Sequence, residues 1–235
     1  MLARLGQLGL GCLGLSSMGL PGQAFAAGLG GPLAGLLIKA SDTSLDKLAR
    51  PGAFYNDPET RIALPLVGGL GGSSGGSGLG GALGSVLGTT SKLGLTDGLV
   101  RAINDAAGVA AGEAKPIFRT AINNLSLSDA PDIVKNKDGA TRYLRTSAGD
   151  ELHGKLRPLV DGGLAKAGAY RQLDSLQKKS SIFAKAGITR DALGRSVTEQ
   201  ALNGIFGYIG KEEMALRDNP LGAAGGLLNG LLGND

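Results

Sequence analysis

The segment from Ser196 to Pro220 constrains the fold most, because its hydrophobic pattern, its charges and its ending all indicate one helix. Its apolar residues recur with the 3.6-residue period of an α-helix, so they would form a single stripe that faces a core. Glu213 and Arg217 lie four residues apart with the acid first, the favourable order for an ion pair along a helix. Pro220 would end the helix just after Asn219. The predicted stripe consists of Val197, Leu202, Ile205, Phe206, Ile209 and Leu216.

Helical patterns also precede this segment. Leu33 to Arg50 is predicted to form a first helix, and a second, long helix is predicted from a cap at Thr96 to about Leu125. Pro116 would either kink the long helix or begin a new helix at its first turn.

The rest of the chain continues in the same way, with short joints between helices. The predicted elements are Ser128 to Val134, a helix opening at Asp138 and holding Tyr143, Thr146 to Lys166 with a bend or restart at Pro158, and Ala169 to Ser181, followed by a cap at Thr189 or Asp191. No alternation of apolar and polar residues is long enough to indicate a sheet. We therefore expect an all-α fold, a multi-helix bundle of about six to eight helices with a flexible insertion.

Composition divides the chain into five segments. Glycine accounts for 42 of the 235 residues, which limits the core that the chain can build. The Gly/Ser tract from Gly68 to Gly88 has too few side chains to fold by itself, and it is no phosphate-binding loop, since Lys92 is followed by Leu93. The expected segments are a signal peptide (1–27), an N-terminal helix with a Pro-rich loop packed on the main domain (28–67), a flexible Gly/Ser-rich segment (68–92), a helical core domain (93–220) and an apolar Gly/Leu tail (221–235).

The first residues have the three parts of a secretory signal. Arg4 supplies the positive start, an uncharged apolar run follows, and Ala24-Phe25-Ala26 is an A-x-A cleavage site, so cleavage is expected between Ala26 and Ala27 or one residue later. A spanning helix is the competing interpretation, but the run is rich in glycine and ends at Pro21. We expect a periplasmic protein. Cys12, the only cysteine, lies inside the signal, and we do not expect it to be a lipoprotein anchor.

Several blocks of sequence carry a resemblance to a known family. They are GAFYNDPETRIALP, GEAKPIF, LSLSDAPDIV, DGATRYLRTSAGDEL, LRPLV and SVTEQALNGIFGYIGKEEMALRDNP. In order and spacing they resemble the bacterial family called domain of unknown function 4197 (DUF4197), and the likeness covers essentially the mature chain. It implies an exported helical protein of Gram-negative bacteria to which no activity has been assigned.

The residue types present argue against most catalytic chemistries. His153 is the only histidine, and the mature chain would contain no cysteine, so a site with two imidazoles, a Ser-His-Asp triad and a Cys-His pair each have one candidate residue or none. We expect no metal and no cofactor. The formal net charge of +4 comes from basic residues interleaved with acids, and four Tyr, five Phe and no Trp offer no stacking platform, so no nucleic-acid partner is expected.

Two clusters supply the candidate ligand-binding residues. Arg142, Tyr143 and Arg145 form a basic and aromatic cluster beside Lys137, and with Lys115 or Lys155 they would build an anion site. Alternatively, the tyrosine packs with its hydroxyl at the surface and the arginines lie around it. The second cluster consists of Glu212, Glu213 and Arg217. Adjacent carboxylates on a helix point about 100° apart, so they would not converge on one bond. The plainer interpretation of Lys211-Glu212-Glu213 is a solvated face with ion pairs.

These observations favour a non-enzymatic protein that binds an unknown partner or ligand through a groove between helices. A carrier for lipid or another apolar ligand is the second hypothesis, and it would require a cavity lined by Leu, Val and Phe. The tail 221–235, which carries no charge before Asp235, would then be a weak membrane-surface segment; its lack of Lys and Arg favours a docked terminal helix instead. A hydrolase is the third, and it would require Glu212, Glu213, Tyr143 and an arginine to converge in a cleft.

Overall fold

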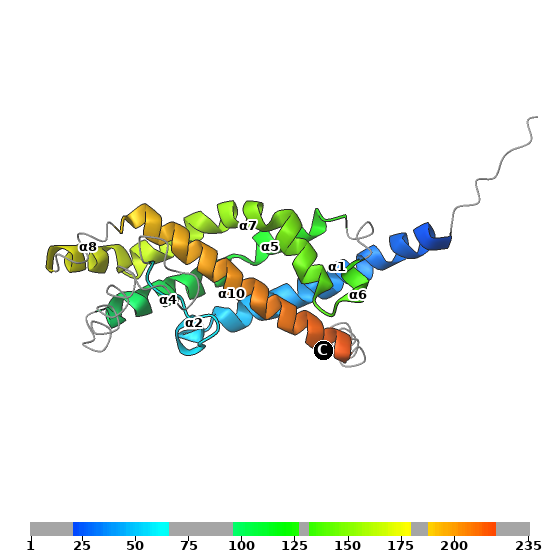
Figure 1. The fold of residues 1–235 in the computed structure, drawn as a ribbon, viewed down its shortest axis with the longest axis horizontal. Helices are drawn as coiled ribbons and strands as arrows, with labels where there is room; N and C mark the ends of the chain where they lie inside the picture. The colour runs from blue at the N-terminus through cyan, green and yellow to red at the C-terminus, as the bar shows by residue number, and fades with distance from the viewer. Residues whose placement is uncertain (1–20, 66–95, 127–131, 180–187, 220–235) are drawn as a thin grey trace, which may run out of the picture.

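The computed structural model describes residues 21–65, 96–126, 132–179 and 188–219. Every regular element within these ranges is an α-helix, and no strand occurs in them. The expected all-α multi-helix bundle is therefore confirmed (Figure 1). Among the described helices none combines the length and the apolar character needed to cross a membrane.

The helix predicted from Ser196 begins earlier than its hydrophobic stripe. Thr189 is its N-cap, and the hydroxyl of Thr189 accepts a hydrogen bond from the backbone N–H of Ala192 at 3.0 Å. Figure 1 shows this helix, α10, running along most of the bundle. The described helices are α1 (Pro21–Leu48), α2 (Ala53–Asn56), α4 (Asp97–Glu113), α5 (Lys115–Asn123), α6 (Asp132–Lys135), α7 (Gly139–Lys166), α8 (Ala169–Lys179) and α10 (Arg190–Asp218).

For two prolines the sequence allowed more than one effect on the helices, and the structure shows a different outcome for each. Pro116 lies in the first turn of α5, so it begins a second helix, as one of the alternatives predicted. Pro158 neither ends nor restarts a helix, because it lies inside α7, a single helix of 28 residues. Pro158 is exposed, while Leu156 and Val160 on either side of it are buried, so the packed face of α7 is uninterrupted. The predicted cap at Ser128 lies outside the described residues.

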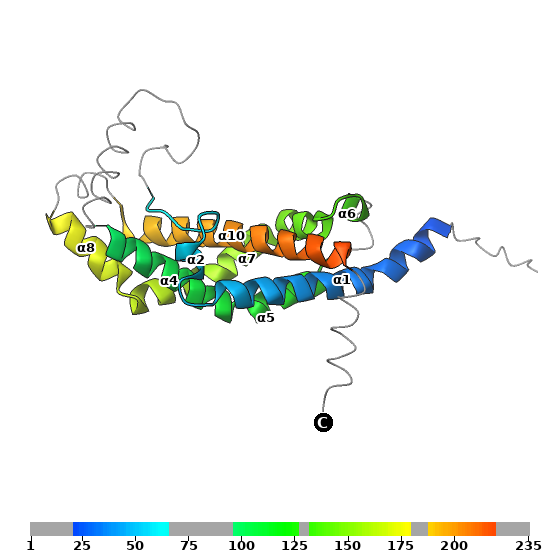
Figure 2. The same ribbon diagram turned by 90° about the horizontal axis from the view of Figure 1, so that it is seen from below.

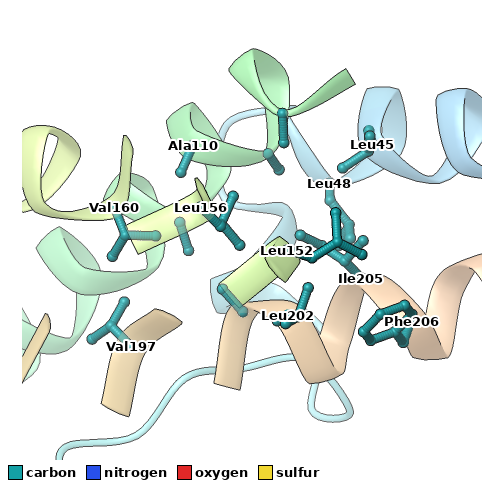
Figure 3. Close-up of a cluster of buried hydrophobic side chains, with 14 of the residues drawn as sticks. Leu45, Leu48, Ala110, Leu152, Leu156, Val160, Val197, Leu202, Ile205 and Phe206 are labelled. Atoms are coloured by element: carbon teal, nitrogen blue, oxygen red, sulfur yellow. The ribbon is translucent and has the colours of Figure 1, made fainter. Parts of the chain in front are cut away.

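The stripe of α10 forms the centre of the hydrophobic core. Val197, Ile205 and Ile209 are fully buried, and only Leu216 of the predicted set is partly exposed. The core also contains side chains from α1, α4, α5 and α7, and Figure 3 shows part of this cluster on the buried side of α10. Phe206 meets Phe118 of α5 edge to face, with ring centroids 6.1 Å apart. The segment recognised from its pattern is thus a core helix that packs on both α1 and α7.

The Pro-rich loop between α2 and residue 65 is held by two side-chain amides. Asn104 of α4 accepts from the N–H of Ile62 at 2.9 Å and donates to its carbonyl at 3.0 Å. Gln200 of α10 makes the same pair of bonds with Ala63, at 3.0 and 3.1 Å. An extended segment has no helical partners for its backbone, so these amides satisfy groups that would otherwise be unpaired. Ile62 itself is buried, which fixes the loop on the core.

Replacing Asn104 with Ala should therefore loosen this loop. The N–H and C=O of buried Ile62 would lose their partners, and we expect the free energy of unfolding to fall by about 1–2 kcal/mol in urea denaturation. Asp105→Ala, at the exposed neighbouring position, is the control and should change it by less than about 0.5 kcal/mol. Equal effects of the two substitutions would contradict the assignment.

Candidate functional site

A groove of about 400 Å³ lies between α7 and α10. The two helices run antiparallel, because Thr141 at the start of α7 meets Glu213 near the end of α10, whereas Arg157 farther along α7 meets Asp191 at the start of α10. We call this hollow the α7–α10 groove. It is lined by Arg145, Gly149, Asp150 and His153 of α7 and by Glu199, Leu202, Asn203 and Phe206 of α10.

Helical spacing and one glycine explain why the groove forms here. Arg145, Gly149 and His153 are four residues apart, so they follow one face of α7. Gly149 contributes no side chain, and a Cβ built at that position would meet no atom within 4 Å. Leu202 and Phe206 are buried at the base of the hollow. The groove therefore has an apolar floor beneath a polar rim.

The charged side chains of the rim are not paired with one another. Arg145 donates to the Oδ1 of Asn203 at 2.5 Å, and its guanidinium lies 5.6 Å from the ring centroid of Phe206. Within the described residues, Arg145, Asp150 and Glu199 form no ion pair. Lys155 and Glu151, also on α7, do pair with each other at 2.5 Å. The rim thus keeps charges of both signs that can contact a partner.

A second, smaller hollow of about 240 Å³ lies on the other side of Asn203, where α10 meets the Pro-rich loop. Two contacts join the loop to α10 here: Lys211 pairs with Glu59, and the hydroxyl of Tyr208 donates to Asp57 at 2.6 Å. The hydrogen bond from Tyr208 lowers the pKa of Asp57, and the same bond raises the pKa of Tyr208 to about 12. These contacts hold the loop on α10, so this hollow has the character of a structural joint.

Glu213 is fully buried, so the solvated-face interpretation is wrong for this residue. Its carboxylate accepts from the backbone N–H groups of Ala140 and Thr141, at 3.0 and 2.8 Å, and from the hydroxyl of Thr141 at 2.6 Å. The first N–H groups of a helix have no partner within it, and the helix dipole favours an anion there. Glu213 therefore caps α7 from α10.

Arg217 completes this buried arrangement. The predicted i,i+4 pair is present, with a guanidinium nitrogen 2.7 Å from the Oε1 of Glu213. The same guanidinium donates to the carbonyl of Ile133 in α6 at 3.2 Å, so the pair ties three helices together. Glu212 points elsewhere and pairs with Lys47 of α1, as the expected divergence of adjacent carboxylates requires.

The basic and aromatic candidates have separate partners. Arg142 pairs with Asp138 at 2.9 Å, and Lys115 pairs with Asp46 of α1 at 2.5 Å. Tyr143 is half-buried, with its hydroxyl 3.5 Å from the carbonyl oxygen of Ser126. Of the residues predicted to bind a ligand, only Arg145 lines the groove.

The acidic residues and His153 of the groove do not assemble into a metal site. In the described ranges no group of three or more His, Cys, Asp or Glu side chains could hold a metal ion. Sequence reasoning gave no role to Glu199 and Asn203, and it assigned Phe206 to the core alone. These residues line the groove only because α7 packs antiparallel to α10, and no local sequence pattern specifies that pairing.

The fold and the groove together define an all-α bundle protein with a charged surface groove. The chain belongs to the family described as protein of unknown function (DUF4197), which it matches over residues 28–233. This confirms the resemblance carried by the sequence blocks. No curated protein and no solved structure matches the chain.

Proposed function

We propose that this chain is an exported, non-enzymatic protein that binds a partner protein in the α7–α10 groove. The observation that carries the proposal is the set of rim charges, Arg145, Asp150 and Glu199, which have no ionic partner among the described residues and stand above an apolar floor. An apolar base with a polar rim is the usual anatomy of a protein interface. An exposed arginine beside an aromatic ring is also typical of residues that dominate binding energy.

The two other hypotheses find less support. The residues that a hydrolase would need have other partners: Glu213 caps α7, Glu212 pairs with Lys47, and Tyr143 lies by Ser126. A carrier would need an enclosed apolar cavity, whereas both described hollows are open and have charged side chains in their lining. The open, charged groove therefore suits a partner protein better than the substrate of a hydrolase or the lipid chain of a carrier.

Export rests on the signal-like first residues and on the course of α1. Figure 2 shows the Pro21 end of α1 projecting beyond the other helices. Among the residues of α1 whose side chains are described, 31–48, the first buried one is Leu37. The family match begins at residue 28, directly after the predicted cleavage site. We place the mature protein in the periplasm of a Gram-negative bacterium.

The intact mass of the protein from the periplasmic fraction tests the export proposal. We expect a chain that begins at Ala27 or Gly28, because signal peptidase requires small residues at the A-x-A positions. Ala26→Leu should leave the longer precursor with the membrane fraction. A wild-type chain that keeps its first residues in the cytoplasm would overturn this part of the proposal.

Site-specific photo-crosslinking in the native periplasm tests the binding proposal. A photoreactive amino acid at Asn203, in the groove, should give a protein adduct, and Arg145→Glu should abolish it by placing an acid beside Asp150 and Glu199. The same amino acid at Val109, 48% exposed on α4, is the control and should not give this adduct. Identical adducts from both positions, or an adduct insensitive to Arg145→Glu, would overturn the proposal.

A further inference from the structure

The α7–α10 groove has a positive charge at one end and negative charges at the other, so two copies of the groove placed in opposite directions would attract each other. Building on the binding function proposed above, we propose that the partner in the groove is a second copy of this chain, related by a two-fold axis. Arg145 of each copy would then contact Asp150 and Glu199 of the other.

The position of each charge along the groove follows from the helix contacts. Arg145 lies level with Asn203 and Phe206, since it bonds to the first and covers the ring of the second. Asp150 is five residues farther along α7, and Glu199 is four residues earlier on the antiparallel α10. At 1.5 Å per residue the backbone positions of both acids lie about 6–8 Å farther along the groove than Arg145 and Asn203, in the same direction. The groove thus has a cationic end and an anionic end.

A two-fold axis reverses this direction in the second copy. In such a dimer each contact occurs twice, because residue i of one copy meets residue j of the other and the reverse also holds. Placing the axis midway between the two ends brings the cationic end of each groove onto the anionic end of its partner. Three rim charges without ionic partners in the described residues would all become paired in this one arrangement.

The shape of α10 is compatible with close approach of a second helix. Asn203 and Gly207 lie on its exposed side, and a Cβ added to Gly207 would meet no atom within 4 Å. Without a side chain at this position, the outer edge of α10 can enter the groove of the other copy and cover Leu202 and Phe206. Figure 1 shows α10 extending along the bundle, so the two copies would meet along α10.

Charge reversal with complementation tests this arrangement. Sedimentation velocity of the purified mature protein over a concentration series should show a dimer. Arg145→Glu alone, and Asp150→Lys with Glu199→Lys, should each raise the dimer dissociation constant at least about 100-fold, because like charges then face each other at both ends. An equimolar mixture of the two variants should form a heterodimer with an affinity near that of the wild type, since opposite charges again meet.

Two controls separate this inference from the broader binding function. Circular dichroism should be unchanged in both variants, and Arg142→Glu, outside the groove, should leave the dimer intact. Variants that fail to associate in the mixture, or a wild-type dimer insensitive to Arg145→Glu, would overturn the inference. A wild-type monomer that crosslinks from Asn203 to a different protein would overturn the second-copy assignment and leave the binding function standing. Absence of both dimer and crosslink would overturn both.

Discussion

Glu213→Ala is expected to lower the free energy of unfolding by about 3–5 kcal/mol, because it breaks a buried ion pair and leaves Arg217 without its anion. The substitution also removes the acceptor for the N–H groups of Ala140 and Thr141 at the start of α7. For a chain of this size the loss corresponds to a fall of about 6–20 °C in Tm. Thermal unfolding followed by circular dichroism measures it.

The neighbouring acid supplies a matched control for Glu213. Glu212→Ala removes only the pair with Lys47, whose side chain is 44% exposed, and surface pairs contribute about 1 kcal/mol or less. If the two substitutions shifted Tm equally, Glu213 would not be the buried cap of α7. Glu213→Gln should lie between them, because the amide keeps one acceptor oxygen and loses the charge.

Gly163→Ala is expected to lower the free energy of unfolding by about 2–3 kcal/mol, because α4 and α7 pack too closely for a methyl group there. A Cβ on Gly163 would lie 2.8 Å from the carbonyl oxygen of Ala106 and 3.1 Å from its Cα. These are backbone atoms, so relief requires the two helices to separate. Urea denaturation gives the value, with the slope of the transition checked for constancy.

Substitution of the adjacent glycine in α7 by alanine should stabilise the protein instead. A Cβ on Gly162 would meet no atom within 4 Å, so Gly162→Ala should raise the free energy of unfolding by about 0.5–1 kcal/mol through helix propensity alone. Because both substitutions change the helix propensity equally, opposite changes in the free energy of unfolding would isolate the effect of the contact between α4 and α7. Stabilisation by both substitutions would contradict the close approach of α4 and α7.

Patterns within one helix predicted much of the fold. The stripe of α10 was correct because a 3.6-residue period is a property of the helix itself, and the pair Glu213–Arg217 was correct because residues four apart are always neighbours. For Pro116 the sequence left a kink and a helix start open, and the structure has the helix start. At Pro158 a bend or a restart was predicted, and the restart is wrong, because α7 is one helix whose packed face continues past the proline.

The groove and the buried acid could not be predicted in this way, since both depend on segments far apart in the sequence. Glu213 and Thr141 are 72 residues apart, and Asn104 and Ile62 are 42 apart. Arg145 was a candidate as part of a basic cluster, but its role beside Asn203 and Phe206 appears only when α7 and α10 lie antiparallel.

The amino-acid sequence by itself determined the all-α class and the family, because each depends on local residue types and spacing. Tertiary structure alone decided that Glu213 is a cap rather than a surface charge, and that Arg145 faces a groove. A charge near a helix end is stabilised or exposed according to which N–H groups and counterions are brought to it. Those neighbours come from other helices, and their positions are set by packing of the whole core.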